Sequence, residues 1–432
     1  MKKYLFPILL LFTTAGFSYG QSLLTIEDAV KLVLRNNYDI LVSRAAADIS
    51  KTNNSAGNAG MLPSVGVRAG DNFSVYNVST EPSTGGTTNY PNFQTNTFSA
   101  AAELDWTLFD GGKMFITRKK LSEMNMLGEI GFRDKVSQTV FNTVLAYYDV
   151  VRQKQQLESV EEGIRNNRER VKILQASFNA GLVPKTDLLQ AQVDLNVYLE
   201  NAILQETIIQ SARRTLNQLL SRDSETPFEV VDSIDLTYHP DKNALTAKLF
   251  SQNTQFLSSM KQLDIAKLST KELVAQRYPW LSLVADYNFL QSTSTQGTIL
   301  MNRSYGPLVG GTLTLPVWYG HKITREVKVA KLEQQSASYD VENTRILVNT
   351  QLQNALSDFE HTLQLLSLEK DNTTLARENL TISMQRLRLG QTTSLEVRQA
   401  EESYIQSLTR LIQFKYSAKA SETKLRQLVA EL

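Results

Sequence analysis

Apolar and polar positions follow two different periods along this chain. In four segments apolar residues alternate with polar or small ones, at about 64–76, 96–108, 280–290 and 305–317. A period of two places successive side chains on opposite faces, so each segment is predicted to be a β-strand. Each is roughly the 9–11 residues that a tilted strand needs to cross a bilayer.

The two faces of these predicted strands differ in charge. Four charged residues share one face, and the apolar face carries only Asp71, near a strand end. The four are Arg68, Glu103, Asp105 and Asp286. A membrane barrel with lipid outside and water inside favours this division, whereas a soluble sandwich with one wet face is the alternative.

A period of three and four replaces the period of two after each strand pair. Residues 111–181 and 320–390 contain no Pro and few Gly, and apolar residues recur there at helical spacing. We therefore expect two continuous helices of roughly 100 Å, because each residue adds about 1.5 Å. Gly181 and Gly390 fit left-handed C-caps, after which a second helix returns.

The same order of segments occurs twice. Residues 106–113 resemble 315–322, and 178–191 resemble 387–400, both at an offset of 209 residues. Pro63 matches Pro279 at an offset of 216, and both prolines are expected to end a helix and begin a strand. We predict a first repeat over 21–221, with its hairpin tip near 181, and a second over 243–432, with its tip near 390. The segment 222–242 links them.

The first twenty residues form a separate segment. Lys2 and Lys3 precede an almost wholly apolar run from Tyr4 to Phe12, and small residues follow at Ser18 and Gly20. This pattern predicts a signal peptide over 1–20 that is removed before Gln21. The chain has 0 Cys, so lipoprotein anchoring is excluded.

Composition argues against catalysis and nucleic-acid binding. Lys and Arg number 45 and Asp and Glu 44, so the chain lacks the basic excess of a nucleic-acid binder. With 0 Cys and 3 His, disulfides, thiolate sites and histidine-rich metal sites have little support. The adjacent pairs Glu161–Glu162 and Glu401–Glu402 are interpreted as solvated helix faces. No catalytic, cofactor or metal site is therefore predicted.

The three tryptophans occupy matched strand ends. Trp106 ends the second predicted strand, Trp280 begins the third and Trp318 ends the fourth. In an up-and-down sheet these positions lie at one level, which suits aromatic residues at a membrane interface. Burial in a protein core is the alternative.

Several segments together resemble the TolC-like outer-membrane efflux proteins. They are residues 24–37, the corner 108–112, Ala146 to Asp149, the tip from Ala180 to Asp187, and 217–220. Tyr38 and Thr107 depart from the family, which often has Pro at these positions. The resemblance implies a homotrimer whose four strands per chain close a 12-stranded outer-membrane β-barrel above a coiled-coil periplasmic tunnel.

The resemblance also implies a passive channel that receives substrates from an inner-membrane pump, of the RND or ABC type, and a periplasmic adaptor. The periplasmic entrance would be lined by Asp187, Glu396 and Gln399. The adaptor would meet the tips at Gly181, Leu182, Gly390 and Gln391. Small-molecule efflux is favoured; type I protein secretion or metal-ion efflux are alternatives, and a secreted structural coiled-coil protein is an alternative of a different class.

Overall fold

The computed structural model describes residues 23–432, so the predicted signal peptide over 1–20 lies outside the described residues. The chain divides into two compact units. The first unit comprises the chain up to Ile40, Val136–Lys242 and Leu352–Leu432. The second unit comprises Leu41–Lys135 and Asn243–Gln351. Each unit thus draws segments from both predicted repeats.

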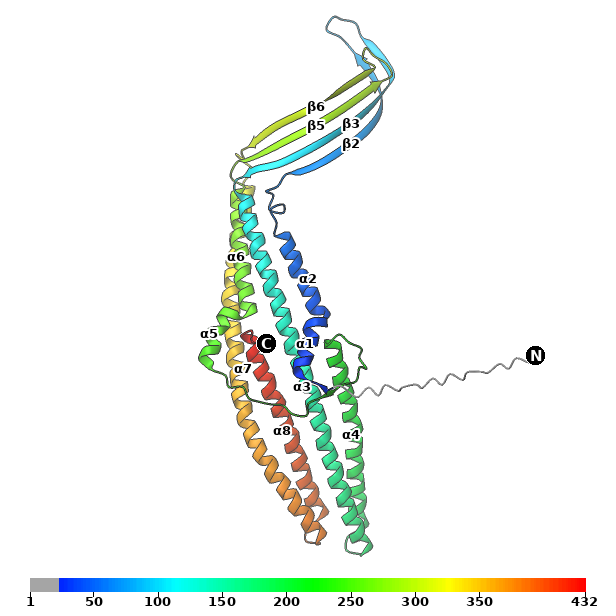
Figure 1. The fold of residues 1–432 in the computed structure, drawn as a ribbon, viewed down its shortest axis with the longest axis vertical. Coiled ribbons are helices and arrows are strands. Elements are labelled where there is room, and N and C mark those ends of the chain that lie inside the picture. Colours follow the sequence, from blue (N-terminus) through cyan, green and yellow to red (C-terminus); the bar gives the residue numbers. More distant parts are fainter. Residues whose placement is uncertain (1–22) are drawn as a thin grey trace, which may run out of the picture. The chain divides into compact units, whose positions relative to one another are not determined.

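A four-stranded antiparallel sheet dominates the second unit. Its strands are β2 (Ser64–Thr80), β3 (Thr88–Asp110), β5 (Trp280–Ser294) and β6 (Met301–Thr314), in the order β2-β3-β5-β6. Figure 1 shows the four strands curving together, with β2 and β6 at the edges. Because β3 pairs with β5, the sheet joins the two repeats.

The division of charge between the faces is confirmed by the strand register. Val67, Ala102 and Tyr287 are paired neighbours across three strands, and their side chains share one face. On the other face Glu103 pairs with Asp286, and its carboxylate lies 3.1 Å from the guanidinium of Arg68.

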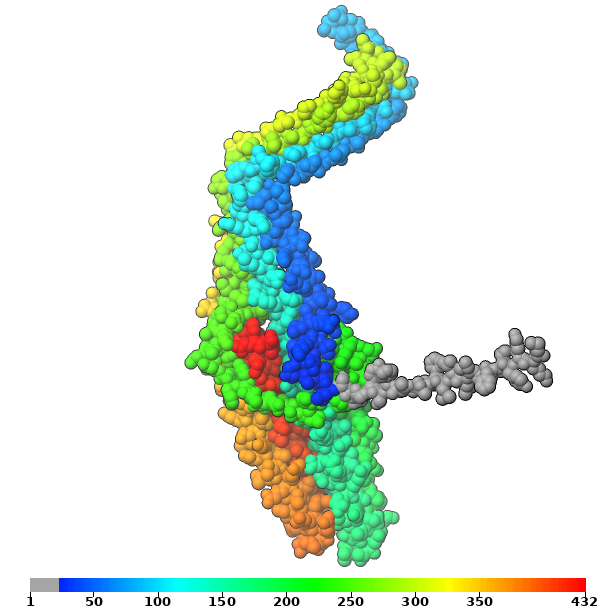
Figure 2. All heavy atoms as spheres, in the orientation of Figure 1, coloured from blue at the N-terminus to red at the C-terminus, as the bar shows by residue number. Residues whose placement is uncertain are grey.

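The apolar face of the sheet is largely uncovered. Val67 on β2 is 83% exposed, and Val309 on β6 is 72% exposed. Figure 2 shows the sheet as a thin layer whose side chains lie at the surface on the side in view. An apolar surface of this extent on a folded chain indicates contact with lipid or with another protein.

The strand ends differ from the sequence expectation. A register shift between Thr107 and Phe109 forms a bulge, so Phe109, and not Leu108, pairs with Leu281. β6 runs over Met301–Thr314 and so ends before Pro316, which has no N–H for the ladder. β3 starts earlier than expected, at Thr88, because its outer part pairs with the end of β2.

A pair of helices precedes the strands in each repeat, and the two pairs end at different distances from the strand that follows. α1 (Ile26–Asn36) and α5 (Lys242–Gln252) have 11 residues each, and Asn37 and Asn253 cap the following helices α2 (Tyr38–Asn53) and α6 (Thr254–Ala275). Pro279 follows α6 closely, but α2 ends ten residues before Pro63. The expectation that Pro63 ends a helix was wrong: a run of turns separates them, and Pro63 only precedes the strand.

Four long helices complete the two repeats. α3 (Lys113–Asn179) and α7 (Lys322–Arg388) have 67 residues each; α4 (Lys185–Leu219) and α8 (Ser394–Leu428) have 35 each. α7 and α8 start 209 residues after α3 and α4, which is the offset that the sequence showed. The predicted fold class, strands followed by long helical hairpins in two repeats, is confirmed. Within residues 23–432, no helix combines the length and apolarity that crossing a membrane requires.

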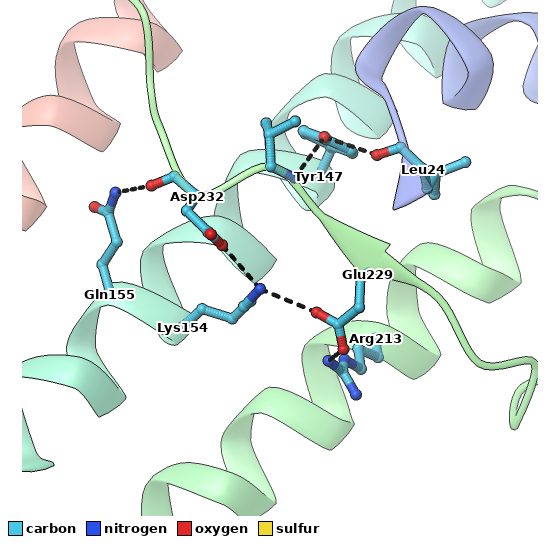
Figure 3. Close-up of polar contacts among 8 residues, drawn as sticks. Leu24, Tyr147, Lys154, Gln155, Arg213, Glu229 and Asp232 are labelled. Atoms are coloured by element: carbon cyan, nitrogen blue, oxygen red, sulfur yellow. Dashed lines mark hydrogen bonds and ion pairs between the residues drawn. The ribbon is translucent and has the colours of Figure 1, made fainter. Parts of the chain in front are cut away.

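The linker between the repeats belongs to the first unit, where polar contacts hold it in place (Figure 3). β4 (Glu229–Val230) pairs in parallel with β1 (Leu23–Leu24). The hydroxyl of buried Tyr147 donates to the carbonyl of Leu24 at 2.9 Å. Lys154 lies 3.0 Å from Glu229 and 2.9 Å from Asp232. These contacts tie the linker to α3.

Candidate functional site

The tips of the two helical hairpins have the same backbone geometry. Gly181 has φ +74° and Gly390 has φ +70°, which confirms the predicted left-handed caps. Leu182 N–H donates to Ser177 O at 2.8 Å, and Gln391 N–H donates to Arg386 O at 2.8 Å. Both helices therefore end in a Schellman motif, whose six-to-one bond satisfies an otherwise free carbonyl.

Apolar side chains project from both tips. Leu182 is 76% exposed, and Leu389, next to Gly390, is 69% exposed. The second tip is also fixed by Arg386, whose guanidinium donates to the carbonyl of Gln391 at 3.0 Å. The tips are therefore ordered turns that present exposed leucines, a property suited to a protein contact.

The predicted entrance residues lie in the first turns after the tips. Glu396 is exposed; its N–H donates to the Thr393 hydroxyl at 3.2 Å, and its carboxylate accepts from the Thr392 hydroxyl. Asp187 takes the equivalent place at the start of α4 and is half-buried. Gln399 is exposed one turn beyond Glu396. Both carboxylates stand at helix N-termini, where the helix dipole favours negative charge.

An apolar cluster joins all four long helices beside the tips. Leu174 of α3, Leu188 of α4, Leu387 of α7 and Val397 of α8 are all buried there. The two hairpins thus share one core next to the predicted entrance. A change in the separation of the hairpins would expose this core, which favours their closed association.

A buried ionic cluster lies farther from the tips. We call Asn167, Arg170, Asp194 and Glu401 the Arg170 cluster. The Arg170 side chain is 1% exposed, and its Nη2 donates to Asp194 Oδ2 at 2.5 Å and to Asn167 Oδ1 at 2.7 Å. Glu401 Oε2 lies 3.6 Å from Arg170 Nη1, and its other oxygen accepts from Asn167 Nδ2 at 2.5 Å. The cluster connects α3 and α4 of one hairpin with α8 of the other.

The cluster holds two acidic groups against one buried cation. Burial raises the pKa of Glu401 to about 7; Arg170 opposes the rise, and Asp194 and Glu402 add to it. The Nε and Nη1 atoms of Arg170 are buried and donate no hydrogen bond within residues 23–432. An ionic cluster with unsatisfied donors contributes little net stability, but loss of one partner leaves an uncompensated charge. The interpretation of Glu401 as a solvated side chain was therefore wrong.

A cavity of about 530 Å³ adjoins the Arg170 cluster. Tyr198, Arg398 and Glu402 line it together with the cluster and with apolar side chains of α4. Gly163 of α3 makes room for Tyr198, because a Cβ at this glycine would lie 2.4 Å from the Tyr198 ring. The helices thus pack closely on one side of the cavity.

Exposed ion pairs also cross between the hairpins. Arg388 Nη2 lies 2.8 Å from Glu169 Oε1, and Arg377 Nη2 lies 3.4 Å from Glu162 Oε1. The hydroxyl of buried Tyr404 donates to the same Glu162 oxygen at 2.8 Å. These solvent-screened pairs contribute less than the apolar cluster.

The Arg170 cluster escaped prediction from the sequence because its members are up to 234 positions apart. One signal was available. The repeat offset of 209 matches Arg170 with Asn379, Asp194 with Ser403 and Glu401 with Gln192. All three charges are absent from the equivalent positions, so the cluster occurs once per chain.

The tryptophans do not share one face of the sheet. Trp106 pairs with Leu283 on the apolar face, and its Nε1 donates to the Met61 carbonyl at 3.1 Å. Trp280 is three positions from Leu283 along β5 and therefore lies on the opposite, polar face. Trp318 follows the end of β6 and is 74% exposed. The expectation concerned the level of the three tryptophans along the strands, and their role as interface aromatics stays a prediction.

In the part of the chain that the structure describes, no three His, Asp or Glu side chains are grouped as metal ligands.

Comparisons with known proteins agree with this architecture. The family model described as "Outer membrane efflux protein" matches residues 29–222 and 245–431. The chain is 20% identical to "Outer membrane protein TolC" of Escherichia coli, over 100% of this chain and 87% of that protein. It is also 20% identical to "Proteases secretion protein PrtF" of Dickeya chrysanthemi, over 90% and 84% of the two chains. The solved CmeC outer membrane channel of Campylobacter jejuni superposes with a TM-score of 0.80 at 18% identity, over 94% of this chain and 85% of that one.

Proposed function

Because this chain belongs to the outer membrane efflux protein family, as the sequence resemblance predicted, we propose that it is the outer-membrane channel of a tripartite efflux system. The family assignment makes it a channel and not an enzyme. Substrates would pass through it without chemical change, driven by a separate inner-membrane pump of the RND or ABC type. Export of the chain would use the predicted signal peptide over 1–20.

The open sheet supports assembly into a trimer. One chain has four strands in this sheet, and within residues 23–432 each edge strand, β2 or β6, pairs on one side alone. Unpaired backbone groups are costly in lipid, so a membrane sheet must close. Three copies would supply twelve strands, with the apolar face of Val67 and Val309 towards lipid. The charged face of Arg68 and Glu103 would line the water-filled interior.

The helical hairpins support a periplasmic tunnel with an entrance at their tips. The exposed leucines at 182 and 389 would meet an adaptor protein, at the turns formed by Gly181 and Gly390. Exposed Glu396 and Gln399 would face the entrance, and Asp187 would flank it. Threefold symmetry would turn Glu396 into a ring of carboxylates, which attracts cations in a narrow pore.

The observation that carries this proposal is the apolar, uncovered sheet face in a chain that also forms two matched helical hairpins. Each hairpin has one helix of 67 residues and one of 35. A structural coiled-coil protein would need the hairpins and not the sheet. Purified full-length protein should form discrete conductance steps in a planar bilayer. Deletion of the gene in its own host should raise sensitivity to pump substrates. Absence of both conductance and an outer-membrane location would refute the channel.

Returning the gene to the same deletion strain distinguishes between the substrate classes. Restored resistance to organic toxins supports small-molecule efflux, which we favour. Restored resistance to metal salts alone, or restored protein export alone, would replace that assignment with metal-ion efflux or type I secretion and leave the channel function intact.

A further inference from the structure

β6 begins earlier than the sequence predicts, at Met301. The added residues bring Arg303 into the sheet, at the end opposite to the corner that leads into α7. Arg303 pairs with Gln291 of β5, and Gln291 pairs with Phe98 of β3. Phe98 is an even number of positions from Ala102, which is on the apolar face. Because paired residues share a face, the Arg303 side chain also lies on the apolar face.

Charged side chains are rare on this face. Among the paired residues of the sheet it carries two, Arg303 and Asp71. Both belong to one row across the four strands, so three strand spacings of about 4.8 Å place their backbones about 14 Å apart. Within residues 23–432, no Asp or Glu side chain forms an ion pair with Arg303. Arg303 is therefore a cation on an apolar surface without an anionic partner in the described chain.

The Arg303 guanidinium is nevertheless held in one orientation. Its Nε and Nη2 both donate to Oε1 of Gln291, at 3.1 and 2.9 Å. A guanidinium has five N–H groups, so those of Nη1 and one of Nη2 remain. The remaining groups form a planar fork that matches two oxygens of a phosphate or carboxylate. Gln291 thus positions Arg303 for an anion from outside the described chain.

The height of Arg303 on the sheet coincides with the edge of a bilayer. Leu313 lies on the same face of β6, ten positions closer to α7. At about 3.4 Å per residue the two are about 34 Å apart along the strand, and a tilt of about 40° reduces this to about 26 Å along the bilayer normal. The apolar band of an outer-membrane barrel is about 25 Å tall. With Leu313 at the periplasmic border, Arg303 reaches the headgroups of the outer leaflet.

Neighbouring side chains mark the same border. Tyr305 pairs with Phe289 on the apolar face, one row nearer the middle of the sheet, and Tyr305 is 69% exposed. One row farther out, Asn96 pairs with Thr293, and both are polar. Aromatic residues favour the membrane interface, where one end is apolar and the other wet. The change from aromatic to polar rows therefore falls at Arg303.

We propose that Arg303, oriented by Gln291, binds a phosphate group of lipopolysaccharide in the outer leaflet. This proposal rests on the membrane barrel proposed above and adds a lipid-binding site to its outer surface. The end of the sheet opposite to the long helices selects the outer leaflet, where phosphates belong to lipopolysaccharide. An arginine is costly on a lipid-facing surface at mid-depth, whereas at the border it can bind a headgroup anion.

Lipopolysaccharide binding to the purified full-length protein tests the site. The probes are lipopolysaccharide with phosphorylated lipid A and the same preparation after removal of its phosphates. The unmodified protein should bind the phosphorylated form at least about tenfold more tightly. Arg303→Gln should bind both forms equally and weakly. Arg303→Lys keeps the charge without the fork, and about threefold of the preference should remain.

Asp71→Asn is the matched control variant. It removes the other charge of the same row and face, so binding of phosphorylated lipopolysaccharide should be at least as tight as in the unmodified protein. Phosphatidylglycerol micelles are the control for the source of the phosphate. A phosphate monoester carries more charge than a diester, so Arg303→Gln should weaken phosphatidylglycerol binding by less than about threefold.

Each outcome decides a separate point. Equal binding of phosphorylated lipopolysaccharide to the unmodified protein and to Arg303→Gln, with normal conductance of both, would overturn the site and leave the channel standing. An equal loss of phosphatidylglycerol binding in Arg303→Gln would overturn the assignment to lipopolysaccharide. Loss of trimers in Arg303→Gln and Asp71→Asn alike would replace the lipid with a contact between copies. Absence of conductance in the unmodified protein would count against the proposed function itself.

Discussion

Arg170 Nη1 lies 3.6 Å from Glu401 Oε2, so a buried ion pair joins the hairpin of the first repeat to that of the second. Both residues are eleven positions from a tip glycine, Gly181 in one case and Gly390 in the other. The pair therefore marks one level of the helical bundle, beyond the apolar cluster that adjoins the tips.

Loss of the Arg170 guanidinium should strongly destabilise the helical bundle at the level of the Arg170 cluster. Arg170→Met leaves the carboxylates of Asp194 and Glu401 without their buried cation, and we expect a loss of about 3–5 kcal/mol in unfolding free energy. Arg388→Gln, which breaks the exposed pair with Glu169, should cost less than about 1 kcal/mol. Denaturant unfolding of the detergent-solubilised protein measures both. Similar costs for the two variants would contradict the burial of the Arg170 cluster.

Glu401 should make stability depend on pH. Folding raises the pKa of its carboxyl group from 4.5 to about 7, so the folded chain holds an extra proton between these values. Stability should therefore fall as pH rises from about 4.5 to about 7, by roughly 1–3 kcal/mol, and level off above. Glu401→Gln should flatten this slope in thermal unfolding across about pH 5–8. Glu402→Gln, at the exposed neighbour, should retain it.

Charge at the entrance should set ion preference. Glu396→Gln would remove three carboxylates from the trimer, and we expect weaker cation selectivity and weaker block by multivalent cations. Gln399→Glu would add three and should change both properties in the opposite direction. Planar-bilayer reversal potentials measure the effect. Unchanged selectivity in both variants would remove these residues from the entrance.

The tips should be needed for export and not for assembly. Leu182→Trp enlarges a side chain that is 76% exposed at the first tip, so trimers and single-channel conductance should stay normal. Resistance of the host should fall, because the adaptor could no longer seat on the turn. Bulky substitution of Gln391 tests the second tip in the same way. Normal resistance together with normal expression would argue against the tips as the adaptor contact.

Opposite faces of β3 should respond differently to charge. Ala100 pairs with Ala69 and Phe289 on the apolar face, whereas neighbouring Ser99 pairs with Gly70 and Leu290 on the polar face. Ala100→Arg should cost about 2–4 kcal/mol near the middle of the bilayer, and Ser99→Arg much less. Heat-modifiable migration of the assembled barrel gives the comparison. Equal tolerance would reverse the assignment of the faces.

Local pattern and internal repetition were sufficient to predict the four strands of the sheet and the four long helices, but not the pairing of β1 with β4 or the breaks between α1 and α2 and between α5 and α6. The period of two predicted the strands, and the glycines at 181 and 390 predicted the caps, because both depend on nearby residues. The bulge at Leu108 was not predicted, although the alternation of apolar and polar residues breaks there, because Leu108 and Phe109 are consecutive apolar residues. The Arg170 cluster was not visible either, because a buried pair such as Arg170 and Glu401 is set by helix packing. Glu401 beside Glu402 has the local pattern of a solvated face.

The matched lengths of the long helices constrain how such a chain can change during evolution. α3 and α7 have 67 residues each, and α4 and α8 have 35 each, so the two tips lie at equal chain distances from the two corners of the sheet. An insertion in one helix alone would leave one tip longer than the other and shift its apolar positions around the helix axis. Viable insertions and deletions should therefore occur in concert, in both arms of a hairpin and in both repeats, and in steps of about seven residues that preserve the packing seam.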